Sequence, residues 1–393
     1  MSLSVSERMS RVAPSATGAV ITLAAELRAA GRNIISLGAG EPDFPTPGSI
    51  ADAGKSAIDG GDTRYTPVDG TRALKQAIQR KFVRDNSLQY ETNQILVSSG
   101  AKQTCFNACL AVLDSGHEAI VPAPYWVSYP DMVKLADATP VIVPTSIDSG
   151  FKISPEQLHA AVTDRTRLLF LNSPSNPTGT CYTRDELVRL GAVLEDFPDI
   201  AIAADEIYEH IHWATDRFFS FAEACPQLYE RTITINGVSK CYAMTGWRIG
   251  YAGGPRQVIN AMKTIQSQCT SNPCSISQAA AAAALDGDQS CVAEMTAAYK
   301  KRHDYVVPAL NAVPGFECRT GDGAFYAFPR VTGAIRKTGL ADDVELAEFL
   351  LKEADIAVVP GSAFGSPGYI RISFTCAQAT LEEAIARMRR ALR

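Results

Sequence analysis

The sequence predicts an α/β protein with a large domain, built on a mostly parallel sheet flanked by helices, and a smaller α+β domain. Between residues 94 and 252, short apolar runs of strand length alternate with amphipathic segments of helix length. This alternation is typical of a doubly wound parallel sheet. After about residue 272, a long helical pattern, short strands and a final helix follow instead. A chain of 393 residues is long enough for both domains and for a sizeable core.

The individual elements follow from the apolar spacing and from the positions of Gly and Pro. Apolar residues recur at helical spacing over 15–30, whereas residues 37–47 are too rich in Gly and Pro for a regular element. A further helix is expected over 71–86. The seven expected strands of the large sheet are 95–97, 119–121, 141–143, 168–171, 201–204, 232–236 and 249–252. The helices expected between them are 101–113, 128–136, 155–162 and 185–197.

The pattern of residues in the last third of the chain predicts the smaller domain. An alanine-rich segment at 279–285 fits a buried helix, and a long helix is expected over 290–310. The elements expected after it are a helix at 342–354, strands at 356–359 and 369–373, and a helix at 380–392. We therefore expect an N-terminal segment that packs with the small domain, a large domain and a small C-terminal domain. Their predicted ranges are 1–45, 46–290 and 291–393.

The composition argues against several classes of protein. Thirty-seven basic residues stand against 42 acidic ones, and the formal net charge of −5 gives no field that would attract a nucleic-acid backbone. No run of 18 apolar residues could span a membrane. The ten cysteines form no Cys-x-x-Cys pair, and the N-terminus has no apolar signal segment. We therefore expect reduced cysteines and a cytoplasmic location.

Several common catalytic motifs are missing from the sequence. It contains no G-x-G-x-x-G after a strand, no phosphate-binding P-loop, no H-E-x-x-H metal motif and no G-x-S-x-G nucleophile turn. His210 and His212 form the only histidine cluster. We interpret them as two exposed histidines that alternate on an extended segment, and we expect no metal.

One lysine stands in an unusually apolar segment. Lys240 follows the expected strand 232–236, and its neighbours include Val238, Cys241 and Met244. A lysine that is removed from water has a lowered pKa and can act as a neutral amine nucleophile, which suits Schiff-base chemistry. Most lysines are solvated, so this segment taken alone leaves a surface role open.

Polar groups that could bind a phosphate lie close to Lys240 or after another strand. Ser239 and Arg248 offer a hydroxyl donor and a bidentate guanidinium. The segment 98–102 joins a strand to a helix, and its small residues would let backbone N–H groups approach an anion. Such a segment is also a common connection with no ligand.

Other candidates also follow expected strands, where ligands bind in sheets of this kind. Asp205 could be a helix cap, a loop acid or a buried anion held against a cationic ring nitrogen. Trp126 could stack on a planar ring or fill the core, and the turn that contains Asn172 and Asn176 could face a ligand or be a plain turn. Together with Lys240, these groups are what a phosphorylated pyridine aldehyde needs.

Several longer motifs occur together, in order, from about residue 11 to the C-terminus. They are LGAGEPDFPTP, YTPVDGTRALKQAI, PAPYWVSYP, NSPSNPTG, ADEIYEH, NGVSKCYAMTGWRIGY, GAFY and YIRISF. In these motifs the chain resembles the class I aminotransferases of pyridoxal-phosphate fold type I, in the bacterial branch of aspartate and aspartate/prephenate aminotransferases. The resemblance implies the fold type I architecture, pyridoxal 5′-phosphate as cofactor, and transamination between an L-amino acid and a 2-oxo acid through a Schiff base on Lys240.

The resemblance also implies roles for the site residues. Lys240 would hold the cofactor and then move a proton between the substrate Cα and the cofactor C4′, while Asp205 would keep the pyridine nitrogen protonated. Tyr208 and Asn176 would hydrogen-bond the ring hydroxyl oxygen, and Trp126 would stack on the ring. The groups implied at the phosphate are Ser239, Arg248, Gly100, Ala101, Lys102 and Tyr65 of the partner subunit. The last of these implies a homodimer with shared active sites.

Substrate binding follows from the same resemblance. Arg371 would bind the α-carboxylate that all amino-acid substrates share, helped by Asn176 and by the backbone of Gly40. In this branch, a lysine at the position of Lys102 and a threonine at the position of Thr17 are associated with a second carboxylate. We therefore expect L-aspartate and 2-oxoglutarate as substrates and oxaloacetate and L-glutamate as products.

Other activities stay open. Relatives that use prephenate carry a basic residue just before the PSAT motif, where this chain has Ala13, which counts against prephenate. The same lysine and arginine serve alanine, aromatic and kynurenine aminotransferases, some β-lyases and aminocyclopropane-type synthases. A more distant alternative is a regulator that senses pyridoxal phosphate. Such regulators carry a basic helix-turn-helix segment, for which a resemblance beginning near residue 11 leaves no room.

Overall fold

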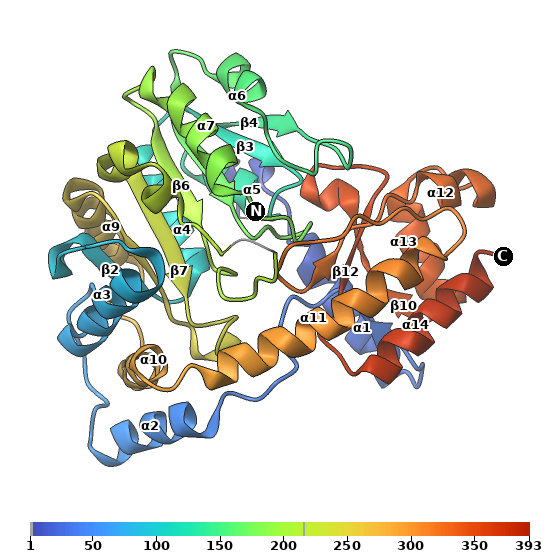
Figure 1. Ribbon diagram of the computed structural model, residues 1–393, viewed down its shortest axis with the longest axis horizontal. Helices are drawn as coiled ribbons and strands as arrows, with labels where there is room; N and C mark the ends of the chain where they lie inside the picture. The colour runs from blue at the N-terminus through green and yellow to red at the C-terminus, as the bar shows by residue number, and fades with distance from the viewer. Residues whose placement is uncertain (1–2, 215–216) are drawn as a thin grey trace.

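The large domain is built on a seven-stranded sheet with the strand order β2-β8-β7-β6-β5-β3-β4. Figure 1 shows this sheet among helices on the left of the molecule. The computed structural model describes residues 3–214 and 217–393, so the first two residues of the predicted N-terminal segment lie outside it. Within this sheet, β8 runs antiparallel to both of its neighbours and the other pairs are parallel, which confirms the predicted mostly parallel sheet. The strands are β2 (Ile95–Ser98), β3 (Glu118–Ala123), β4 (Thr139–Pro144), β5 (Thr166–Asn172), β6 (Ala201–Asp205), β7 (Thr232–Gly237) and β8 (Gly250–Gly253).

Helices cover both faces of the sheet because successive residues of a strand point into different apolar layers. In β5, Leu168 and Phe170 belong to one buried cluster, and Leu169 and Leu171 belong to another. The helices that pack into the first cluster are α4 (Ala101–Val112), α5 (Tyr129–Leu135) and α9 (Arg256–Cys269). Those that pack into the second are α6 (Pro155–Ala161), α7 (Arg184–Glu195) and α8 (Phe221–Ala224).

A third group of helices packs beside β2 and β8. α3 (Arg72–Asn86) and the alanine-rich α10 (Ser275–Asp286) share a buried cluster with these strands, so the prediction of a buried alanine helix is confirmed. α2 (Gly48–Asp59) packs on α10 and was not predicted. Its glycines weaken the apolar pattern, yet Gly54 is needed there, because a Cβ at this position would lie 2.7 Å from the Trp247 ring.

The small α+β domain has its own core. A three-stranded antiparallel sheet of order β11-β12-β9 lies beside the helices, which surround a separate buried cluster. The expected strand over 356–359 is wrong as one element, because its two halves pair with different partners, β1 and β12. The elements are α11 (Ser290–Asn311), β9 (Tyr326–Ala327), α12 (Thr332–Thr338), α13 (Asp343–Glu353), β10 (Ile356–Ala357), β11 (Val359–Pro360), β12 (Ile370–Ser373) and α14 (Gln378–Ala391).

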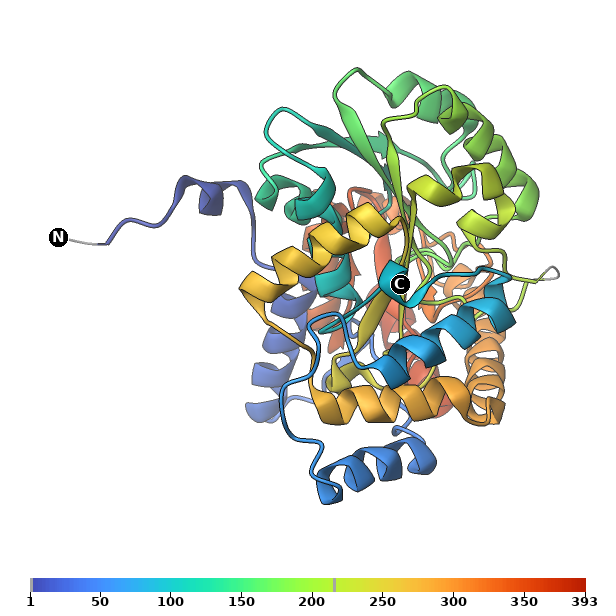
Figure 2. The same ribbon diagram turned by 90° about the vertical axis from the view of Figure 1, so that its left-hand side faces the viewer.

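The N-terminal segment packs against this small domain. β1 (Ile35–Ser36) pairs in parallel with β10, and α1 (Ala16–Ala29) contacts β10 and β11. Figure 2 shows the chain before α1 running outwards from the body, where η1 (Glu7–Arg11) is held through the ion pair of Arg11 with Asp137 at 2.6 Å. The predicted boundaries 1–45, 46–290 and 291–393 stay a prediction. Among the described helices, none has the length and apolar character that spanning a bilayer requires.

Three neighbouring strands end side by side at one edge of the large sheet. In the register of the sheet, Asn172 of β5 lies beside Asp205 of β6, and Asp205 lies beside Ile235 of β7. Because parallel strands end at the same edge, the polar residues that follow them gather in one place. Lys240 follows β7 by only a few residues, so it reaches this edge as well.

Candidate active site

A cavity of about 270 Å³ opens at this edge of the sheet. Its walls come from the strand ends of the large domain, from the N-terminal segment and from β9 and β12 of the small domain. The predicted site residues that line it are Thr17, Gly40, Ala101, Lys102, Trp126, Asn176, Asp205, Tyr208, Ser239, Lys240, Arg248 and Arg371. Segments far apart in the sequence therefore meet in one site.

Lys240 lies in the wall of the cavity, with its Nζ donating a hydrogen bond to the Gly40 carbonyl oxygen at 2.7 Å. Burial lowers the pKa of this lysine to about 8, and the nearby Glu41 and Asp205 carboxylates only partly oppose that effect. The predicted desolvated amine is thus present. Gly40 contributes its carbonyl, which accepts from Lys240.

Asp205 is the last residue of β6, and its side chain is buried. Its Oδ2 accepts a hydrogen bond from the Tyr129 hydroxyl at 2.5 Å, and its Oδ1 accepts one from the Ile207 N–H at 3.2 Å. Burial raises the pKa of Asp205, and these two donors and Lys240 act in the opposite direction. Of the alternatives open from the sequence, the structure shows a buried carboxyl group in the cavity wall, and its contact with a ring nitrogen stays a prediction.

A set of anion donors lies at the start of α4, close to Arg248 and Ser239. Gly100 caps this helix with φ of 89°, and a Cβ at Gly100 would collide with the Arg248 guanidinium. Arg248 donates to the Thr245 carbonyl at 2.8 Å and lies exposed beside the helix start. The free N–H groups at a helix start, a hydroxyl and a guanidinium form a cradle that suits a phosphate. Gly100 itself does not line the cavity.

Arg371 enters the cavity from β12 and is fully buried. It donates to Asn176 Oδ1 at 3.0 Å and to the Gly38 carbonyl at 2.5 Å, and its guanidinium carbon lies 4.6 Å from the centroid of the Tyr326 ring. Its Nε has no hydrogen-bond partner among the described residues. Each terminal nitrogen also has a second N–H that these two bonds do not use, and such donors can bind a carboxylate oxygen in the cavity.

Lys102, Trp126 and Thr17 also line the cavity. The Lys102 Nζ lies 5.0 Å from the centroid of the Trp126 ring, which is a cation–π contact. Partial burial and the charge of Arg248 lower the pKa of Lys102. Tyr65 lies outside this cavity and is 90% exposed, so it does not serve the site of its own chain.

Some residues of the site were not predicted from the sequence. Tyr129 lines the cavity and holds Asp205, and the Tyr326 hydroxyl lies 2.8 Å from that of Tyr208. Both are in motifs noted above, PAPYWVSYP and GAFY. A tyrosine in an apolar segment is typical of a core, so only the position of Tyr129 three residues after Trp126, across a turn, could have indicated a role.

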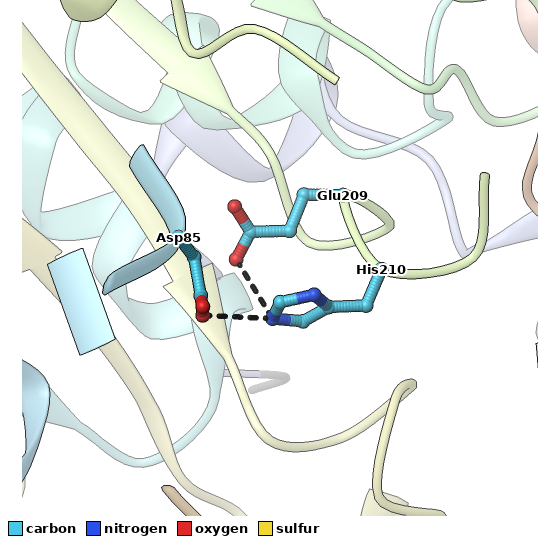
Figure 3. Close-up of side chains that lie close together, drawn as sticks. All are labelled: Asp85, Glu209 and His210. Carbon is cyan, nitrogen blue, oxygen red and sulfur yellow. Dashed lines mark ion pairs between the residues drawn. The ribbon is translucent and has the colours of Figure 1, made fainter. Parts of the chain in front are cut away.

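A second cluster of charged side chains lies behind the site. Figure 3 shows Asp85 and Glu209 facing the Nε2 of His210, each at 3.3 Å. Three such groups could hold a metal ion, but Glu209 already forms a buried ion pair with Lys81. His210 and His212 are both half-buried, so the prediction of exposed histidines is wrong: the turn after β6 folds inwards.

Comparison with known proteins decides the family. Residues 32–388 match the sequence model of a protein family that is described as aminotransferase class I and II. The chain belongs to the class I and II aminotransferases. This aminotransferase is 52% identical to the aspartate/prephenate aminotransferase of Nitrosomonas europaea, over 98% of this chain and 99% of that protein.

Solved structures agree with this assignment. The aspartate aminotransferase from Rhizobium meliloti superposes with a TM-score of 0.96 at 45% identity, over 100% of this chain and 99% of the other. The aspartate aminotransferase from Thermus thermophilus with maleate gives 0.93 at 40% identity, over 99% and 100%. The predicted fold type I architecture and the transamination reaction of this aminotransferase are therefore confirmed, and the regulator alternative is set aside.

Proposed function

We propose that this aminotransferase uses pyridoxal 5′-phosphate to transfer the amino group of L-aspartate to 2-oxoglutarate. The observation that carries the proposal is the meeting of Lys240, Asp205 and Arg371 in one cavity. A desolvated amine, a buried carboxylate and a buried guanidinium with unused N–H donors are the groups that an aldehyde, a pyridine nitrogen and a substrate carboxylate require.

The residues present fit this cofactor. The Gly100 cradle, in which a Cβ would collide with Arg248, and the start of α4 suit its phosphate. Trp126 suits the face of its ring, Tyr208 and Asn176 suit its hydroxyl, and Ser239 adds a donor at the phosphate end. When bound, pyridoxal phosphate supplies an aldehyde that condenses with amines and a cationic ring that withdraws electrons from the substrate Cα.

Three side chains of the protein have separate roles in this reaction. Arg371 binds and orients the substrate α-carboxylate through the N–H groups of its terminal nitrogens that Asn176 and Gly38 leave unused, and the cavity walls exclude water around it. Asp205 holds a proton on the ring nitrogen. Lys240, with its pKa lowered to about 8 by burial, is neutral often enough to take the proton from the substrate Cα and return it.

Specificity for a dicarboxylate rests on the distal residues. Lys102 and Thr17 line the same cavity as Arg371, so the cavity offers a second cation to a substrate with a second carboxylate. Relatives named as aspartate aminotransferases support this assignment. The name of the Nitrosomonas europaea relative favours prephenate as a second acceptor, whereas Ala13 supplies no positive charge for it.

A panel of amino donors with 2-oxoglutarate tests the proposal. We expect the highest kcat/KM for L-aspartate, with lower values for alanine and the aromatic amino acids, and a separate assay with prephenate as acceptor measures the second candidate. A preference for alanine or an aromatic donor would refute the dicarboxylate assignment. Release of ammonia and pyruvate without an acceptor would indicate a lyase.

We further propose a homodimer with shared sites. Tyr65 is 90% exposed and outside its own cavity, and Leu3 and Val5 before η1 are also exposed, as expected for residues that a second copy covers. Light scattering at micromolar concentration should give twice the chain mass of 42.1 kDa. Mixing Lys240→Ala and Tyr65→Phe chains should give mixed dimers in which one active site has Lys240 from one chain and Tyr65 from the other. A cytoplasmic location stays a prediction from the sequence.

A further inference from the structure

A buried tyrosine lies directly behind the carboxylate of Asp205. Tyr129 is the first residue of α5, and its ring stacks on Phe170 with centroids 4.4 Å apart and an interplanar angle of 18°. The ring also meets Trp126 edge-on, at 5.3 Å and 83°. The Tyr129 N–H donates to the Trp126 carbonyl at 3.0 Å, so one turn of chain carries both aromatic residues. Packing on two sides holds the hydroxyl of Tyr129 in one direction.

That hydroxyl acts as a hydrogen-bond donor to Asp205. Burial and the neighbouring negative charge of Asp205 raise the pKa of Tyr129 well above its ordinary value, so the phenol keeps its proton. The hydrogen bond to Asp205 Oδ2 is 2.5 Å long, which is in the range of charge-assisted O–H···O⁻ bonds. The buried Cys105 thiol lies 4.0 Å from the same oxygen and is also protonated.

Burial disfavours the charged form of Asp205 and raises its pKa, and the hydrogen bond from Tyr129 is the largest of the contacts that oppose this effect. Tyr129 and the Ile207 N–H hold its two oxygens, and no described lysine, arginine or histidine forms an ion pair with it. A carboxylate in this setting stays available to a positive group in the cavity. Without the hydrogen bond from Tyr129, less would compensate for the cost of burying the charged Asp205 carboxylate.

We propose that Tyr129 is a positioning residue that keeps Asp205 ionised and aimed at the protonated ring nitrogen of the cofactor. This inference rests on the proposed function, because it requires that Asp205 bind that nitrogen. Tyr129 acts through Asp205 and does not touch the reacting atoms. The effect of Tyr129 on cofactor affinity must therefore disappear when either Asp205 or the ring nitrogen is removed.

The experiment is a double-mutant cycle on cofactor affinity. Cofactor-free protein is titrated with pyridoxal phosphate, following its absorbance, for the wild type, Tyr129→Phe, Asp205→Ala and the double variant. We expect Tyr129→Phe to weaken binding about 10- to 100-fold in the wild-type background, as for loss of a hydrogen bond to a charged group. In the Asp205→Ala background it should change affinity less than about twofold.

Two further measurements separate this role from a structural one. A pyridoxal phosphate analogue with carbon in place of the ring nitrogen should bind the wild type and Tyr129→Phe equally well. The matched control is Tyr182→Phe, since Tyr182 is a buried tyrosine outside the cavity whose hydroxyl accepts from the Ile153 N–H at 3.0 Å. This control should leave the affinity for pyridoxal phosphate unchanged. Site-specific 3-fluorotyrosine at position 129 keeps the donor and should bind the cofactor at least as tightly as the wild type.

The outcomes distinguish the inference from the proposed function. If the wild type binds pyridoxal phosphate and Asp205→Ala weakens binding while Tyr129→Phe does not, the inference is overturned and the proposed function stands. An equal loss with Tyr129→Phe in both backgrounds, or with the carbon analogue, also overturns it. If the wild type does not bind the cofactor, or Asp205→Ala binds it unchanged, the proposed role of Asp205 fails and the inference fails with it.

Discussion

Replacement of Lys102 by alanine tests the assignment of the distal carboxylate. Lys102 lines the same cavity as Arg371, and its Nζ lies over the Trp126 ring, 5.0 Å from the ring centroid. A hydrogen bond to a charged group contributes about 1.5–3 kcal/mol. Because the Lys102 side chain is exposed at the rim of the cavity, solvent weakens the contact and the lower end of this range applies.

A loss of about 1.5 kcal/mol corresponds to about a tenfold decrease in kcat/KM. We expect Lys102→Ala to show it for L-aspartate, mainly through a higher KM, and to change kcat/KM for L-alanine less than about twofold. The assay couples oxaloacetate or pyruvate formation to NADH oxidation, with 2-oxoglutarate as acceptor. Lys55→Ala, which removes an exposed lysine of α2, is the control. Equal losses for both donors would refute the reasoning and indicate a phosphate-binding or structural role.

The other predictions concern the buried groups behind and within the site. Asp205→Ala should retain some cofactor but lower kcat at least 100-fold, as for loss of a preorganised charged group, and an unchanged kcat in steady-state assays would remove the role of the cationic ring. Because the pKa of Lys240 is lowered to about 8, the fraction of neutral amine increases as the pH rises through 8. The rate at which cofactor-free protein reacts with pyridoxal phosphate should therefore rise between pH 7 and 9 and then level off. A rise that continues to pH 10.5 would contradict burial of the amine. Glu209→Ala removes the carboxylate that forms the ion pair with the buried Lys81 ammonium and leaves it only the hydrogen bond to Asn86. The free energy of unfolding in urea titrations should therefore fall by about 3–5 kcal/mol. Glu383→Ala breaks an exposed ion pair and should leave the unfolding midpoint close to that of the wild type.

The strand ends could be predicted from the residues themselves. Apolar runs fix the strands, and the edge at which parallel strands end gathers whatever polar residue follows them. For this reason Asp205 and Lys240 could be proposed as neighbours from the sequence alone. The apolar residues around Lys240 also indicated the correct direction of its pKa.

The site residues that come from distant segments of the chain could not be predicted in the same way. Arg371 and Gly40 come from the small domain and from an irregular segment, and no periodicity connects either of them to the sheet. Only the resemblance to a family brought them into the site. Tyr129 was missed even so, because a tyrosine among apolar residues predicts packing, and its hydrogen bond depends on how α5 sits on the sheet. α2 was missed because two glycines interrupt its pattern.

The central claim is that the Lys240 amine carries the cofactor opposite Asp205. Borohydride reduction of protein loaded with pyridoxal phosphate, followed by peptide mass spectrometry, tests it most directly. We predict one phosphopyridoxyl group per chain, attached to the peptide that contains Lys240, and none on Lys240→Ala protein. A label on another lysine such as Lys102, or no label on the wild type, would contradict the assignment of Lys240 as the residue that carries the cofactor.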